Sequence, residues 1–121
     1  MNKKQNIIYL AGLLDGEGHF RVQNAKNGEG RPYLRPEIDV TNTNEEICIW
    51  LELNFGGKYR SHKGYKETWS RVHRWTITGR KAIELAKQVE PYLIIKRDQV
   101  KRLTRIKRDS HGFIVKATAY N

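Results

Sequence analysis

The nine residues Leu10-Ala11-Gly12-Leu13-Leu14-Asp15-Gly16-Glu17-Gly18 decide the fold of this chain. Their first half has the pattern of a helix, because Ile7, Leu10 and Leu14 are spaced to form one buried stripe. One side of this helix can pack on the core of its own chain, and we expect the other side to need a further partner. That second stripe consists of Ile8, Ala11, Gly12 and Asp15.

The end of the same stretch is an acidic turn that places Asp15 and Glu17 beside the C-terminus of the helix. The helix macrodipole disfavours anions at this end, so a bound cation would offset the cost of the two carboxylates. A simpler interpretation is a buried helix that ends at a glycine cap and is followed by two solvated acids. The residue types alone leave both interpretations open.

The composition indicates one basic domain over residues 1–121, which is long enough for a hydrophobic core. Lysine and arginine total 23 against 13 acids, and a net charge of +10 favours nucleic acid over acidic membrane as the partner. No apolar run approaches transmembrane length and no signal peptide opens the chain, so we expect an intracellular protein, cytoplasmic or organellar. The single cysteine, Cys48, excludes an internal disulfide and a CxxC metal site.

The patterns along the chain predict an α+β fold in the order helix, hairpin, helix, hairpin, helix, helix. This order is typical of an antiparallel sheet that is covered by helices on one face. Within the second strand, Pro36 favours an edge position or a bulge. The tail over 110–121 is expected to be a short extra strand or a loose arm. The expected strands lie at about 19–26, 31–42, 57–64 and 68–77, and the later helices run from a cap at Asn42 or Asn44 to Phe55, over 79–89 and over 95–109.

The open face of this sheet is predicted to be polar, basic and aromatic. A two-stranded ribbon fits the major groove of DNA, where Arg and Gln read base edges and Lys holds phosphates. A merely solvated sheet face is the alternative, and the net charge favours DNA. The candidate DNA-contacting residues are Arg21, Gln23, Lys26, Arg31, Tyr33, Arg35, Asp39, Lys58, Arg60, His62, Arg71 and His73.

The opening stretch closely resembles the signature of the LAGLIDADG homing endonucleases. It departs from that signature at Leu14, which stands for Ile, at Gly16, which stands for Ala, and at Glu17, which stands for Asp. The resemblance implies the αββαββα fold of the family, with a saddle-shaped antiparallel sheet. A chain with one motif further implies a homodimer whose motif helices pack along the symmetry axis. The matching residues are Leu10, Ala11, Gly12, Leu13, Asp15 and Gly18.

The resemblance also implies a set of catalytic residues. Glu17 and the backbone carbonyl of Gly16 would ligate a divalent metal, expected to be Mg²⁺, while Asp15 would support the turn. Lys96 resembles the lysine that polarises the attacking water or offsets negative charge, although without the resemblance it is one more lysine on a basic helix. Asn42 matches the residue that orders active-site water, whereas Glu46 stands where relatives can carry a basic residue.

Together these features imply an intron-encoded type of homing endonuclease. It would bind a long pseudo-palindromic duplex as a homodimer and hydrolyse one phosphodiester on each strand, leaving short 3′ overhangs. The alternatives are an RNA-splicing maturase with intron RNA as partner, a non-catalytic DNA-binding protein on the same fold, and a basic structural protein with a coincidental motif. The sequence holds no dinucleotide fingerprint, Walker lysine or serine nucleophile elbow.

Overall fold

The computed structural model describes residues 1–63, 71–108 and 114–117, with side chains described up to residue 105. The expected strand ends at 64 and 68–70 therefore lie outside the described residues, as do 110–113 and 118–121 of the tail. The elements in chain order are α1 (Lys3–Glu17), β1 (Gly18–Lys26), β2 (Pro32–Asn42), α2 (Glu45–Phe55), β3 (Lys58–His62), β4 (Val72–Thr78), α3 (Arg80–Val89), the 3-10 helix η1 (Glu90–Tyr92), α4 (Arg97–Thr104), β5 (Ile106–Arg108) and β6 (Ile114–Ala117).

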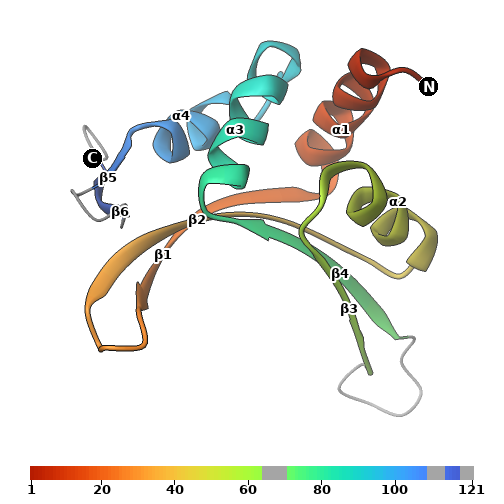
Figure 1. Ribbon diagram of the computed structural model, residues 1–121. Helices are drawn as coiled ribbons and strands as arrows, with labels where there is room; N and C mark the ends of the chain where they lie inside the picture. Colours follow the sequence, from red (N-terminus) through yellow and green to blue (C-terminus); the bar gives the residue numbers. More distant parts are fainter. Residues whose placement is uncertain (64–70, 109–113, 118–121) are drawn as a thin grey trace.

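The first four strands form one antiparallel sheet in the order β1-β2-β4-β3. Helices α1, α2, α3 and α4 lie on one face of this sheet, and the opposite face is concave (Figure 1). The strand register places Phe20 opposite Ile38, and Val40 opposite Trp75, on the helix-covered face, where all four side chains are buried. The predicted α+β class and the αββαββα order are thus confirmed.

Helix α1 buries the predicted stripe, because Ile7, Leu10 and Leu14 belong to the hydrophobic core. Its second stripe is only partly at the surface. Ile8 is 43% exposed, and a Cβ built on Gly12 would have nothing within 4 Å. Ala11, in contrast, is fully buried within its own subunit. It lies four residues after Ile7 and three before Leu14, on the core side of the helix, so its predicted place in a dimer contact is wrong.

Strand β2 lies between β1 and β4 in the sheet. The edge position predicted from Pro36 is therefore wrong, because β2 is not an edge strand. The pairing of β2 with β4 begins only at Glu37, opposite Thr78. Pro36 lies one residue outside this ladder, so the missing N–H of proline removes no bond to β4. Its carbonyl oxygen instead accepts a hydrogen bond of 3.0 Å from the backbone N–H of Gly79.

The last helix is shorter than the predicted range 95–109, since α4 ends at Thr104. Residues 106–108 form β5 instead, which pairs with β6 so that Ile106 lies opposite Ala117. Ile95, the first residue of the predicted range, precedes α4 and is 74% exposed. Strand pairing with a segment further along the chain overrides the helical spacing here. Among the described residues, no helix has the length and apolar character needed to cross a bilayer.

Gly18 joins α1 to β1 at a point where a side chain does not fit. A Cβ at this position would lie 2.8 Å from the backbone Cα of Leu14. We therefore expect Gly18→Ala to lower the free energy of unfolding by about 1–3 kcal/mol, as overpacking does, in a chemical denaturation experiment. Gly16→Ala is the control, because a Cβ there meets nothing within 4 Å. Equal stability of Gly18→Ala and the wild type would contradict this packing.

Candidate active site and nucleic-acid interface

Glu17 and Asn42 meet where α1 and β2 end. The side-chain Nδ2 of Asn42 donates a hydrogen bond of 2.7 Å to Oε2 of Glu17, which is exposed. The other end of the Asn42 amide, Oδ1, accepts a bond of 2.7 Å from the backbone N–H of Asn44. This second bond orients the amide so that its NH₂ group faces the carboxylate. Two of the three predicted catalytic residues therefore share one site.

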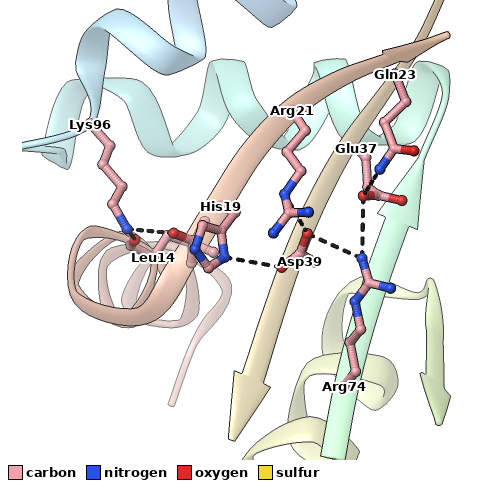
Figure 2. A network of polar contacts seen from close by, with 9 residues as sticks. Leu14, His19, Arg21, Gln23, Glu37, Asp39, Arg74 and Lys96 are labelled. Carbon is pink, nitrogen blue, oxygen red and sulfur yellow. Dashed lines mark hydrogen bonds and ion pairs between the residues drawn. The ribbon is translucent and has the colours of Figure 1, made fainter.

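Lys96 reaches the same end of α1 from the start of α4 (Figure 2). Its Nζ donates to the carbonyl oxygen of Leu14 over 2.9 Å and also to that of Gly18, the residue after Glu17. An ammonium group is favourable at the C-terminus of a helix, where carbonyl groups lack intrahelical partners. The structure thus brings all three predicted catalytic residues to one turn, and the chain itself supplies a cation there.

Asp15 fastens this turn to the segment between η1 and α4. Its carboxylate accepts backbone hydrogen bonds from Ile94 over 2.7 Å, and from Ile95 and Lys96 over 3.1 Å each. Burial alone would raise the pKa of Asp15, but the backbone bonds from Ile94, Lys96 and Ile95 and the charge of Lys96 outweigh it, so the pKa lies below the ordinary value of 3.8. Asp15 therefore supports the turn from within its own subunit.

On the concave face, nitrogen-bearing side chains of neighbouring strands surround Asp39 (Figure 2). Its carboxylate lies 3.2 Å from Nδ1 of His19, 3.3 Å from Nε of Arg21 and 3.3 Å from Nη2 of Arg74. Asp39 is only 1% exposed. The predicted direct contact of Asp39 with DNA is therefore corrected, because its oxygens are buried beneath these three groups.

Glu37 is a second buried carboxylate on the same face of β2. Its Oε2 accepts a hydrogen bond of 2.7 Å from Nε2 of Gln23 and one of 3.4 Å from Nη2 of Arg74. The same nitrogen of Arg74 also donates to Oδ2 of Asp39. A single guanidinium group thus bridges the two acids.

The register assigns most predicted DNA-contacting residues to the concave face, and four residues lie elsewhere. His73 lies opposite Asn42 on the helix-covered face, is 7% exposed and has its Nδ1 2.7 Å from the hydroxyl of Tyr59, so its predicted role is wrong. Lys26 is exposed, but the register places it on the helix side. Arg71 is also exposed, precedes β4 and donates a hydrogen bond of 2.9 Å to Oγ of Ser61. Arg31 lies in the β1–β2 turn. The residues on the concave face are Arg21, Gln23, Tyr33, Arg35, Lys58, Arg60 and His62, together with the buried Asp39.

The sequence prediction missed Arg74, which lies in the middle of this face. Trp75 and Ile77 are buried, and their spacing would have placed Arg74 on the opposite side of β4 from His73. A cavity of about 590 Å³ opens beside Arg74. It is lined by five cationic side chains and one carboxylate: Arg35, Lys58, Arg60, Arg74 and Lys81, with Glu37.

No family model matches this sequence, and no curated protein matches it significantly. The solved structures nevertheless show that the chain has the fold of the LAGLIDADG homing endonucleases, which confirms the resemblance at the level of the fold. At the sequence identities found, this likeness establishes the fold alone.

Several of the similar structures were solved with DNA. The homing endonuclease I-CvuI in complex with its target has a TM-score of 0.66 and 18% identity, over 85% of this chain and 68% of that one. The archaeal intron-encoded endonuclease I-Vdi141I complexed with DNA has a TM-score of 0.63 and 18% identity, over 84% and 66%. The LAGLIDADG homing endonuclease I-GzeII in complex with its DNA target has a TM-score of 0.58 and 17% identity, over 83% and 35%.

The attachment of Asp15 to the backbone predicts a pH-dependent contribution to stability. Asp15→Asn should lower the free energy of unfolding at neutral pH by about 1–3 kcal/mol, because one oxygen and the charge of the acceptor are lost. Since the folded-state pKa is depressed, the stabilisation is present above the unfolded-state pKa of about 3.9 and disappears as the pH falls through the folded-state value. Denaturation of both proteins across this pH range measures the difference. Glu29→Gln, at an exposed acid, is the control, and a difference that does not depend on pH would contradict the assignment.

Proposed function

We propose that this protein is a site-specific DNA endonuclease that acts as a homodimer on a long pseudo-palindromic duplex. It would hydrolyse one phosphodiester on each strand and leave short 3′ overhangs. The convergence of Glu17, Asn42 and Lys96 at the end of the motif helix carries this proposal. The fold supports it, since similar structures are named homing endonucleases and were solved with DNA.

The cofactor of the proposed reaction is a divalent metal, Mg²⁺. Proteins often hold this ion through one or two carboxylates together with phosphate oxygens of the substrate. The exposed carboxylate of Glu17 and the backbone carbonyl of Gly16 are donors of this kind and would hold the ion. When bound, the metal would supply a hydroxide nucleophile and stabilise the charge on the phosphoryl group. One similar structure, of I-CvuI, was solved in the presence of 2 mM Mg with uncleaved DNA.

The other residues of the site would orient groups and offset charge. Asn42 holds one carboxylate oxygen of Glu17 through a bond of 2.7 Å, which restricts the directions that the side chain can take. The ammonium group of Lys96 is fixed at the end of α1, where a cation would offset the negative charge that develops on a phosphate under attack.

The homodimer follows from the number of carboxylates that cutting a duplex requires. One subunit supplies one Glu17, and cleavage of both strands in a symmetric target needs two equivalent sites. The uncovered side of α1, with Ile8 and Gly12, can bring two subunits together because Gly12 permits a close approach of two helices.

The concave face would hold the DNA. The cavity of five cationic side chains beside Arg74 can bind backbone phosphates, and Nε of Arg35 is buried with no hydrogen-bond partner among the described residues. Neutralising phosphates in this way makes affinity fall steeply with salt. A maturase on the same fold would also bind a polyanion, but it has no need of an exposed acid oriented by an asparagine. The contact between Glu17 and Asn42 therefore favours the nuclease.

We expect Glu17→Gln to lose cleavage and keep binding. The amide has the size of the carboxylate but lacks its charge, so cleavage of a selected target in Mg²⁺ should fall by on the order of 10²-fold or more. Binding should stay close to that of the wild type, because the concave face is unchanged. Cleavage of a library of duplex targets and gel-shift titration measure the two quantities.

Glu84→Gln on the exposed side of α3 is the matched control, since it makes the same charge change away from the site. It should cut at the wild-type rate. A Glu17→Gln variant that cuts as fast as the wild type would remove Glu17 from the mechanism. Wild-type protein that binds a target in Mg²⁺ and never cuts it would reject the nuclease.

A further inference from the structure

We propose that Asp39 and Glu37 are positioning residues for sequence recognition, which hold Arg21, Gln23 and Arg74 in the orientation that reads base edges. This inference rests on the proposed function, because it assumes that the concave face binds DNA. It assigns the two acids a role that neither catalysis nor phosphate binding requires.

Two carboxylates are unexpected at the centre of a surface that would bind a polyanion. They stand two residues apart on β2, and so on the same face, and both are buried: Asp39 is 1% exposed and Glu37 is 4% exposed. A buried charge is costly unless it is paired and hydrogen-bonded. Each acid meets this requirement through side chains of neighbouring strands, so the acids are built into the face together with their partners.

The two acids lie deeper below the surface than the arginines that they contact. The side chains of Arg21 and Arg74 are 46% and 39% exposed, while those of Asp39 and Glu37 lie beneath them at 1% and 6%. A carboxylate that reads cytosine must reach the base edge in the groove, and these buried oxygens cannot. The exposed guanidinium groups can reach it, so the acids act on DNA only through the side chains that they hold.

The contacts with the two acids restrict the orientation of arginine and glutamine, which are well suited to recognise bases. Arg21 pairs with Asp39 through Nε, over 3.3 Å. Arg74 uses Nη2 for both acids, and Gln23 uses its amide nitrogen for Glu37, which fixes the direction of its carbonyl oxygen. Bidentate recognition of guanine by Arg and of adenine by Gln requires such fixed planes.

The proposal predicts opposite changes in specificity and in general affinity. Asp39→Asn removes one negative charge from each subunit, so binding to duplexes of unrelated sequence should be unchanged or tighter. The same substitution releases Arg21 and Arg74, so the preference for particular bases should fall. A purely structural role for Asp39 would alter stability and leave the preference of the folded protein unchanged.

The test is selection of bound sequences from a pool of duplexes that are randomised over their central segment. We expect the wild type to enrich a motif, and Arg21→Ala and Arg74→Ala to show which base pairs of it these side chains read. At those base pairs, Asp39→Asn should lower the preference about fivefold or more. Glu37→Gln should do so at the pairs read by Arg74 and Gln23. Glu84→Gln on α3 makes the same charge change and should leave every preference unaltered.

The outcomes distinguish a failure of this inference from a failure of the proposed function on which it rests. A wild type that enriches no motif would reject both sequence recognition and the inference. A wild type that enriches a motif, together with folded acid variants that keep its preference at every base pair, would overturn the positioning role alone. If Asp39→Asn does not fold, as shown by thermal melting, Glu37→Gln decides the matter by the same criterion.

Discussion

The structure depends on a reciprocal set of hydrogen bonds at the C-terminus of α1. The set consists of Asp15, Lys96 and the backbone groups that they bind, and we call it the α1–α4 clamp. The carboxylate of Asp15 accepts the backbone N–H groups of 94–96, while Nζ of Lys96 donates to carbonyl oxygens of Leu14 and Gly18. The carboxylate satisfies loop N–H groups, and the ammonium adds a second hydrogen bond to the Leu14 carbonyl, which also accepts the backbone N–H of Gly18. Residues about 80 positions apart in the chain are fixed side by side.

The α1–α4 clamp fixes the position of the groups at the end of α1. It holds the end of α1, where Glu17 is the last helical residue and Asn42 at the end of β2 reaches its carboxylate. It also leaves the opposite side of α1, at Ile8 and Gly12, uncovered. One helix thus carries a buried stripe, an oriented acid and an uncovered side. The sheet beyond it divides into a face that packs under the helices and a concave face that holds charged groups.

The sequence predicted the features that local spacing determines. The stripe of Ile7, Leu10 and Leu14 and the order of elements follow from periodicity. The prediction was wrong where segments far apart in the chain determine the structure. Strand β5 pairs with β6, so α4 ends earlier than predicted. Pro36 is tolerated inside the sheet because the pairing of β2 with β4 starts one residue later. The proposed catalytic residues could be predicted only through the family resemblance. The carboxylates of Asp39 and Glu37 looked like surface groups, since nothing in a strand pattern reveals that arginine side chains of β1 and β4 cover them.

The most direct test of the paired-helix arrangement is a cross-link at Gly12. Cys48 is the only natural cysteine and is buried, and burial raises the pKa of its thiol, so a cysteine introduced by Gly12→Cys would be the reactive one. If two α1 helices pack along a symmetry axis on DNA, mild oxidation in the presence of target duplex should give a disulfide-linked dimer that still cuts both strands in Mg²⁺. A protein that stays monomeric on its target, or a cross-linked dimer that no longer binds it, would contradict the arrangement.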